Sequence, residues 1–261
     1  MLLKNKTAIV YGGSGAVGGA VAKAYAREGA RVFLAARNRA GLEAVAGEIR
    51  AAGGTAEIAT LDVMDRASVD AHLADVAAKA GPVTLMFNGV SWADTQGELL
   101  NDMAFERMME PIRLSMVSWF NTGTAVAQHM GDNSGGAIVG ITANVARWPV
   151  AYVGGFGIAC AAVENFLRQL GIENGPKGVR VLWVRSPGSP DAPGVRDAWQ
   201  LRADEKGMTF DDIHREFAKD TPLRKITALA QVADAAVLLS SDLAAGMTAT
   251  LANATGGAQV D

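Results

Sequence analysis

The sequence predicts an α/β protein with one doubly wound parallel sheet of about seven strands and helices on both faces. Three observations predict this fold class. Apolar runs of strand length alternate with helical patterns along nearly the whole chain. Most of these runs are hydrophobic at consecutive positions, which is typical of strands that are covered on both faces. The first run breaks into glycines and resumes as an alanine-rich helical pattern, so the chain begins as a strand–turn–helix unit.

The expected elements follow in order along the chain. Strands are expected at residues 8–11, 30–36, 56–63, 83–90, 136–143, 179–186 and 248–254. Helices are expected at residues 17–28, 39–52, 68–80, 104–130, 156–174 and 228–241. No repeat, low-complexity tract or linker divides this pattern, so a single domain over residues 1–261 is expected.

One irregular span, residues 186–225, interrupts the alternation. It contains four of the eight prolines and a short helix whose N-terminus would be capped by Thr209 with Asp212. The span follows a late strand, on the side of the sheet where ligands bind in such folds. We therefore expect it to act as a lid over the substrate, with an ordinary surface excursion as the alternative.

The composition excludes several classes of function. At 261 residues and 49% hydrophobic content, the chain can bury one sizeable core. A net charge of −3 gives no electrostatic basis for binding nucleic acid or an anionic membrane, and no apolar run is long enough to span a bilayer. One cysteine excludes an internal disulfide, and the first six residues are too short and too charged for a signal peptide, which fits a cytoplasmic protein. No metal site is expected, because His72, His129 and His214 are scattered without further ligands at metal spacing.

The glycine-rich stretch after the first strand predicts a nucleotide-binding turn. Glycines let the backbone turn tightly and approach a phosphate without an intervening Cβ. The helix that follows points free N–H groups and its positive dipole end at that phosphate. The residues expected to contact the cofactor here are Gly12, Ser14, Gly15, Ala16, Val17 and Gly18.

The end of the second strand indicates which dinucleotide would bind. An acidic residue at this point would bond the ribose hydroxyls of NAD(H). Here the strand ends Ala36-Arg37-Asn38-Arg39, with no carboxylate and two guanidinium groups. A guanidinium suits a 2′-phosphate because it is permanently charged and presents a planar fork of donors. We therefore expect NADP(H), with Arg37 and Asn38 beside the adenosine ribose; the alternative is a solvated helix start.

Further motifs stand at the ends of later strands. Leu61-Asp62-Val63 ends the third, Asn88-Gly89-Val90-Ser91 the fourth, and Pro187-Gly188 follows the sixth. Together with the glycine turn, they resemble motifs of the short-chain dehydrogenase/reductase family over essentially the whole chain. This sequence departs from the family pattern at Tyr11 and Ala16 in the turn. It also departs at Ala192, a position where relatives often have a threonine that contacts the cofactor. The resemblance implies a Rossmann-type fold, with cofactor contacts from Asp62, Val63, Asn88, Gly89, Pro187 and Gly188.

The resemblance fails at the catalytic positions. The family uses a Tyr-x-x-x-Lys pair on one helix, a serine at the end of the fifth strand, and an asparagine one helix earlier. The lysine lies one turn from the tyrosine and lowers the phenol pKa, so that the phenol can exchange a proton during hydride transfer. By this resemblance the tyrosine, lysine, serine and asparagine positions hold Phe156, Cys160, Ala143 and Ser115. Phenylalanine cannot donate a proton, alanine cannot polarise a carbonyl, and a thiol carries no positive charge, which excludes the standard chemistry.

Three functions remain open at this stage. The first is an oxidoreductase that acts on an apolar or aromatic carbonyl or alcohol, with Tyr152 as a relocated proton donor four residues before Phe156. Enoyl reductases of the superfamily likewise carry an earlier tyrosine, although they keep the lysine. The second is a cofactor-binding pseudoenzyme with a structural or sensing role, and the third is a non-redox lyase or isomerase. A nucleophilic Cys160 is less favoured, because no histidine or lysine lies nearby in the sequence to lower its pKa.

The surroundings of the pocket can also be anticipated. Further polar groups could come from Thr142, Asn144, Arg147 and Ser186. The aromatic residues Trp92, Trp148, Tyr152 and Phe156 are expected to border an apolar pocket for a small-molecule substrate.

The two longest expected helices indicate self-association. Residues 104–130 and 156–174 carry apolar side chains around more than the single stripe that packing on a sheet requires. Along the first helix these side chains are Met108, Leu114, Val117, Trp119, Phe120 and Val126. Relatives commonly use these helices to form dimers and tetramers, so we expect a homo-oligomer, either a dimer or, preferentially, a tetramer.

Overall fold

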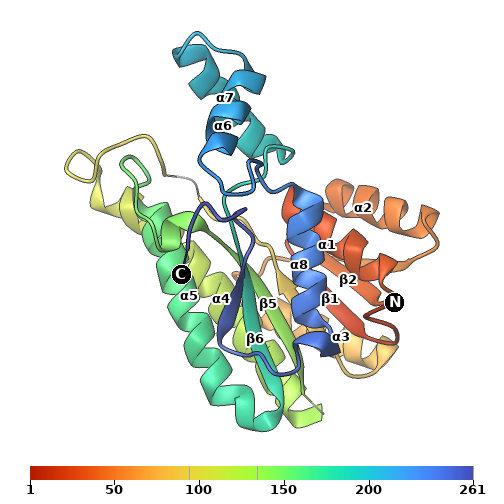
Figure 1. The fold of residues 1–261 in the computed structure, drawn as a ribbon. Coiled ribbons are helices and arrows are strands. Elements are labelled where there is room, and N and C mark those ends of the chain that lie inside the picture. Colours follow the sequence, from red (N-terminus) through yellow and green to blue (C-terminus); the bar gives the residue numbers. More distant parts are fainter. Residues whose placement is uncertain (94, 134, 261) are drawn as a thin grey trace.

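A seven-stranded parallel sheet forms the centre of the protein, as predicted (Figure 1). The computed structural model describes residues 1–93, 95–133 and 135–260, apart from the side chains of residues 198, 201, 202 and 205. In chain order the strands are β1 (Thr7–Tyr11), β2 (Arg31–Ala36), β3 (Thr55–Thr60), β4 (Leu85–Asn88), β5 (Gly136–Ala143), β6 (Val179–Ser186) and β7 (Thr250–Asn253). The spatial order β3-β2-β1-β4-β5-β6-β7 reverses direction between β1 and β4. Ligands of such sheets bind at this switch point, beyond the carboxyl ends of the strands.

Helices cover both faces of the sheet. The long helices are α1 (Ala16–Arg27), α2 (Arg39–Ala51), α3 (Arg66–Ala80), α4 (Phe105–Asn133), α5 (Gly155–Asn174) and α8 (Leu229–Ser240). Apolar side chains of α1, α2 and α8 pack on one face, and those of α3, α4 and α5 pack on the other. Neighbouring residues of one strand divide between the two layers: Val10 and Leu34 face the first, while Ile9 and Phe33 face the second. This division explains why the strands read as continuous apolar runs. In the described residues, no helix has the length and apolar character needed to cross a membrane.

Several strands are shorter than the sequence predicts. The third ends at Thr60 instead of residue 63, and the fourth covers Leu85–Asn88 instead of 83–90. The last covers Thr250–Asn253 instead of 248–254. Apolar residues continue past each ladder because the loops beyond them, including Val63 and Val90, pack on the same core. As a result, Asp62 and Val63 lie in a loop at the edge of the sheet and not within a strand.

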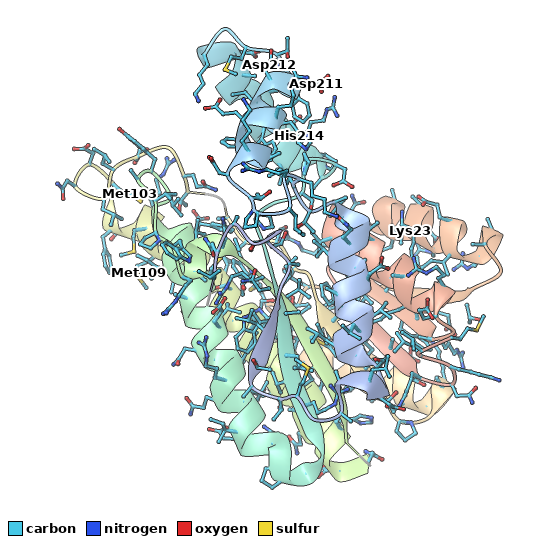
Figure 2. All side chains as sticks on the ribbon, in the orientation of Figure 1. Lys23, Met103, Met109, Asp211, Asp212 and His214 are labelled. Atoms are coloured by element: carbon cyan, nitrogen blue, oxygen red, sulfur yellow. The ribbon has the colours of Figure 1, made fainter. Side chains whose placement is uncertain are left out.

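The span 186–225 contains two helices, although one short helix was expected. The first, α6 (Pro193–Glu205), was not predicted. The second, α7 (Phe210–Lys219), begins at the predicted capping box, in which the side chains of Thr209 and Asp212 each accept a hydrogen bond from the other residue's backbone N–H. Pro193 is the first residue of α6, a position where proline is compatible with a helix, so it marked a helix start and not irregular structure. Trp199 of α6 packs edge-on against Phe217 of α7, with ring centroids 4.8 Å apart. The two helices stand away from the sheet (Figure 1), and Asp211 and Asp212 lie near their tip, with His214 closer to the sheet (Figure 2).

Candidate functional site

A cavity of about 470 Å³ lies at the switch point of the sheet. Of the predicted cofactor residues, it is lined by Gly12, Ser14, Gly15, Ala16, Val17, Arg37, Asn38, Asp62, Val63 and Gly89. The cavity is also lined by six residues that were not predicted from the sequence: Ala36, Leu61, Met64, Val90, Ser91 and Leu114. The first four adjoin predicted residues and Ser91 ends the quoted motif after β4, so all five could have been included on that ground. Leu114 comes from α4 and reaches the cavity only through tertiary packing.

The glycine turn leaves no room for larger residues. Gly12 has φ +76°, and a Cβ there would lie 2.5 Å from the backbone of Gly89. A Cβ on Gly18 would lie 2.3 Å from the carbonyl oxygen of Gly12, so both glycines are required by the close approach of β1, α1 and the loop after β4. α1 begins after Gly15 with no cap from a described side chain and no acidic residue in its first turn. Its first N–H groups therefore remain available to an anion in the cavity.

Arg37 and Asn38 differ in whether their side chains already have a hydrogen-bond or ion-pair partner in the described structure. Arg37 is exposed on the cavity rim, and no ion pair holds it among the described residues. The side chain of Asn38 caps α2, its Oδ1 accepting from the N–H of Gly41 at 3.1 Å. Arg39, the second guanidinium of the motif, bonds Glu43 at 3.3 Å. Arg37 is thus the cation of this motif that remains available to a ligand in the cavity.

Four predicted cofactor residues do not line the cavity. Gly18 packs behind the turn, as described above. Asn88 is buried; its Nδ2 donates to Thr122 Oγ1 at 3.0 Å and its Oδ1 accepts from the N–H of Val90 at 3.0 Å, which fixes the end of β4. Pro187 and Gly188 begin the segment after β6, and the described cavity lining does not extend to them.

The four positions that correspond to the family's catalytic residues hold side chains with little acid–base capacity. Ser115 is fully buried on α4, and its hydroxyl donates to the carbonyl of Ile112 at 3.0 Å. Ala143 ends β5, and Phe156 lies in the first turn of α5. Cys160 is buried, and burial raises the pKa of its thiol to about 12, although a hydrogen bond with the backbone of Ala143 acts in the opposite direction. A thiol with this pKa is protonated at neutral pH, which does not suit a nucleophile.

A buried charge cluster lies one turn beyond Cys160, and the sequence analysis did not anticipate it. Glu164 Oε1 accepts from Thr142 Oγ1 at 2.9 Å and from Arg185 Nε at 3.0 Å, while its Oε2 accepts from a terminal nitrogen of Arg185 at 2.8 Å. Glu164 is 3% exposed and Arg185 is 1% exposed. The cluster ties α5 to the ends of β5 and β6, and it occupies the Thr142 hydroxyl that was a candidate for the site.

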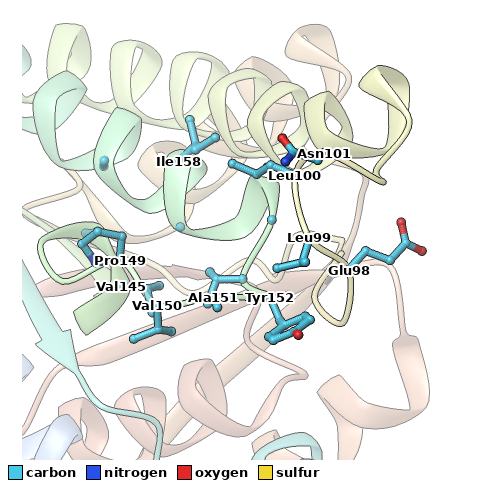
Figure 3. A pocket seen from close by; sticks show the side chains of 15 residues that line it. Glu98, Leu99, Leu100, Asn101, Val145, Pro149, Val150, Ala151, Tyr152 and Ile158 are labelled. Carbon is cyan, nitrogen blue, oxygen red and sulfur yellow. The ribbon is translucent and has the colours of Figure 1, made fainter.

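Tyr152, the predicted proton donor, lines a second cavity of about 490 Å³ (Figure 3). This cavity lies between residues 98–101, residues 145–154 and the start of α5, and among the described residues it shares no lining residue with the first cavity. Tyr152 is 55% exposed and has φ +67°, a left-handed conformation that is uncommon for a bulky residue.

The four aromatic residues do not form one pocket. Trp92 and Phe156 contact each other, with ring centroids 6.0 Å apart, whereas Tyr152 lines the second cavity. Trp148 is half exposed and lines neither of these cavities in the described structure. The expectation of a shared aromatic pocket was therefore wrong: the left-handed turn at Tyr152 and the positive φ of Gly154 redirect the chain between Trp148 and Phe156.

Comparison with known proteins identifies the family. Residues 6–200 match the short chain dehydrogenase family. The chain is 29% identical to 2,3-dihydro-2,3-dihydroxybenzoate dehydrogenase of Bacillus subtilis over 248 residues, which cover 94% of this chain and 93% of that protein. It is also 29% identical to 3-oxoacyl-[acyl-carrier-protein] reductase of Chlamydia trachomatis over 257 residues, or 98% of each chain. The chain belongs to the short-chain dehydrogenase/reductase family and has the NAD(P)-type fold of its oxidoreductases.

Solved structures show the same fold. A protein from Burkholderia xenovorans, described as a short-chain dehydrogenase/reductase, superposes with a TM-score of 0.87 at 29% identity and 99% coverage of both chains. A variant of actinorhodin polyketide ketoreductase, crystallised with NADPH, superposes with a TM-score of 0.86 at 24% identity and 97% coverage of both chains.

Proposed function

We propose that this chain is an NADP(H)-dependent oxidoreductase with a non-standard active site, acting on an apolar or aromatic carbonyl or alcohol. The unpaired Arg37 on the rim of the glycine-turn cavity carries this proposal. The turn, the uncapped start of α1 and Arg37 together offer two places for anions, one for a pyrophosphate and one for a 2′-phosphate. When bound, the nicotinamide would supply or accept the hydride. Relatives named as dehydrogenases and reductases support the reaction class.

The cofactor preference tests this proposal directly. NADPH is expected to bind about 10- to 100-fold more tightly than NADH, because a charge-assisted arginine–phosphate contact contributes roughly 1.5–3 kcal/mol. Arg37→Ala should remove most of this preference, because it should lower the affinity for NADPH and leave the affinity for NADH unchanged. Arg39→Ala is the matched control, since Arg39 bonds Glu43, and it should leave both affinities near wild type. Fluorescence titration of both cofactors measures these values; equal affinities in the wild type, or no binding, would exclude NADP(H) specificity.

Tyr152 is our candidate for the proton donor. Its phenol lies outside the cofactor cavity, so the proposal requires residues 145–154 to move when substrate binds. The left-handed backbone of Tyr152 and the neighbouring Gly154 are consistent with a segment that can change conformation. The span 186–225 is proposed as the lid that closes over the substrate.

Removal of the phenolic hydroxyl tests this role. Tyr152→Phe should abolish NADPH-dependent reduction of aromatic ketones while leaving the NADPH affinity unchanged, because general acid catalysis is typically worth ~10²–10⁴ in rate. Trp148→Phe, a second exposed aromatic in the same loop, serves as the control and should retain turnover. Turnover by Tyr152→Phe at the wild-type rate would assign the proton donor elsewhere.

A pseudoenzyme is the second candidate, and the buried, protonated Cys160 beside Phe156 favours it. In that case no carbonyl compound is turned over, although NADPH binds. The combined substitution Ala143→Ser, Phe156→Tyr and Cys160→Lys then separates two causes. Gained carbonyl reductase activity would mean that only the proton donor was missing. Inactivity with a folded protein and bound NADPH would mean that the nicotinamide is misplaced as well.

A further inference from the structure

Trp92 lies between the rim of the cofactor cavity and the first turn of α5. It directly follows Ser91, which lines that cavity beyond the end of β4. Its indole ring contacts the ring of Phe156, with centroids 6.0 Å apart and planes inclined by 47°. The indole is therefore held beside Phe156, the residue that replaces the family's tyrosine.

The indole Nε1–H of Trp92 is buried and has no hydrogen-bond partner among the described residues. An indole N–H can only donate, and its direction is fixed by the ring. Buried donors are nearly always paired, because an unpaired one loses its hydrogen bonds to water without compensation. The Trp92 N–H therefore needs an acceptor that the described chain does not supply.

Two hydroxyls near the same edge of the sheet share this property. Thr95 follows β4 and Ser189 follows β6, on either side of β5 in the sheet. Each residue is 3% exposed, and Thr95 Oγ1 and Ser189 Oγ have no partner among the described residues. Thr95 and Ser189 thus add two unpaired hydroxyls in the loops beyond β4 and β6, whereas the Thr142 hydroxyl near the end of β5 is bonded to Glu164.

We propose that Trp92 Nε1–H donates a hydrogen bond to an oxygen of a ligand that lies against Phe156, beside the cofactor cavity. The ligand class is a planar apolar or aromatic molecule that carries one acceptor oxygen, such as an aryl ketone. The two rings contact the apolar part, and the N–H fixes the oxygen. An indole does not ionise at physiological pH, so Trp92 orients and polarises the oxygen but supplies no proton. This inference deepens the proposed function and relies on it only for the ligand's position beside the cofactor.

A matched pair of probes isolates this hydrogen bond. Acetophenone and ethylbenzene have similar shapes, but only the ketone offers an acceptor. The affinity ratio of ketone to hydrocarbon is measured by ligand-observed NMR on the NADP⁺-treated protein, and its change between wild type and variant isolates the hydrogen bond. Trp92→Phe should lower the ratio about 2- to 12-fold, the worth of one neutral hydrogen bond, because it keeps an aromatic ring and removes only the donor. Trp148→Phe should retain the wild-type ratio.

The indole resonances provide a direct second measurement. The protein has five tryptophans, and the Trp92 N–H resonance is the one that disappears in Trp92→Phe. It should shift downfield with acetophenone and not with ethylbenzene. An unshifted resonance up to the solubility limit of the ketone, or an affinity ratio unchanged in a folded Trp92→Phe, overturns the proposal. A separate titration of NADP⁺ distinguishes the failure of this inference from the failure of the proposed function. If NADP⁺ does not bind but the ketone still depends on Trp92, only the proposed function is refuted.

Discussion

At the residue scale, His72 shows how burial sets the chemistry of one side chain. His72 lies on α3 and packs edge-on against Tyr11, the residue before the glycine turn, with ring centroids 5.9 Å apart. Burial lowers the pKa of His72 to about 4; the charge of Asp75 raises it by a smaller amount, and Lys79 lowers it further. The imidazole is therefore neutral in the folded protein at neutral pH.

This lowered pKa predicts a loss of stability in mild acid. The unfolded chain takes up a proton on this histidine as the pH falls through about 6.5, whereas the folded chain does so only near pH 4. The contribution of His72 to the free energy of unfolding is therefore present above pH 6.5 and is lost as the pH falls to 4. This loss amounts to roughly 3 kcal/mol at most.

The substitution His72→Gln tests this contribution. A neutral amide does not titrate, so urea unfolding of the variant should lose less stability between pH 7.5 and pH 4 than the wild type. Comparison at pH 7.5 measures any loss of packing against Tyr11 separately. Parallel pH profiles for the two proteins would show that His72 is not the group responsible.

At the scale of elements, the Glu164–Arg185 pair joins α5 to the sheet. Its two charges come from residues 21 apart in the sequence, and Thr142 adds a third attachment at the end of β5. These contacts fix α5 one turn beyond Cys160, whose thiol bonds the backbone of Ala143 at the end of β5. Burying such a pair costs desolvation energy, so the pair itself adds little to the free energy of unfolding. Removing one partner, however, leaves a buried charge without compensation and destabilises the protein strongly.

The expected cost of breaking the pair is large. Glu164→Ala removes the carboxylate that compensates a buried guanidinium, and it should lower the free energy of unfolding by about 3–5 kcal/mol. Glu164→Gln keeps the size and some of the hydrogen bonds, so its loss should be smaller. Glu173→Ala, at an exposed site on the same helix, is the control. Equal denaturation midpoints for Glu164→Ala and Glu173→Ala would show that the pair does not hold α5.

At the scale of the whole molecule, several large apolar side chains remain exposed on α4 and α5. Trp119 and Val126 are buried in the protein's own core, whereas Phe105, Phe120, Ile158 and Ile172 are exposed. A surface of this kind is typical of a protein–protein interface. These side chains support our proposal of a homo-oligomer that associates through α4 and α5.

Sedimentation velocity tests this assembly. The wild type should sediment as a dimer or tetramer of the 27.1 kDa chain, and Phe120→Glu should shift it toward the monomer, because a carboxylate would be buried in the interface. Leu223→Glu places the same charge on an exposed leucine that belongs to neither helix and should leave the assembly intact. A monomeric wild type at micromolar concentration would contradict the proposal.

Local patterns in the sequence were sufficient for the fold class and for much of the lining of the cavity at the glycine turn. The order of strands and helices follows from hydrophobic periodicity, and the glycine turn follows from the steric limits at Gly12 and Gly18. Arg37 and Asp62 could be placed because each follows a strand whose end lies at the edge of a parallel sheet. These inferences depend only on neighbouring residues and on the geometry that every sheet of this kind shares.

Only the tertiary structure decided how the residues around Phe156 are grouped. Trp92 and Phe156 are 64 residues apart, and they meet because β4 and β5 are adjacent and end at the same edge of the sheet. Tyr152 is four residues from Phe156 but lines the second cavity, which Phe156 does not, because the backbone has a positive φ at Tyr152 and again at Gly154. Proximity in the sequence therefore misplaced Tyr152, whereas Trp92 and Phe156, which were expected around one pocket, do contact each other. The contacts depend on which strand ends are neighbours and on how one loop turns, and neither is encoded in a local pattern.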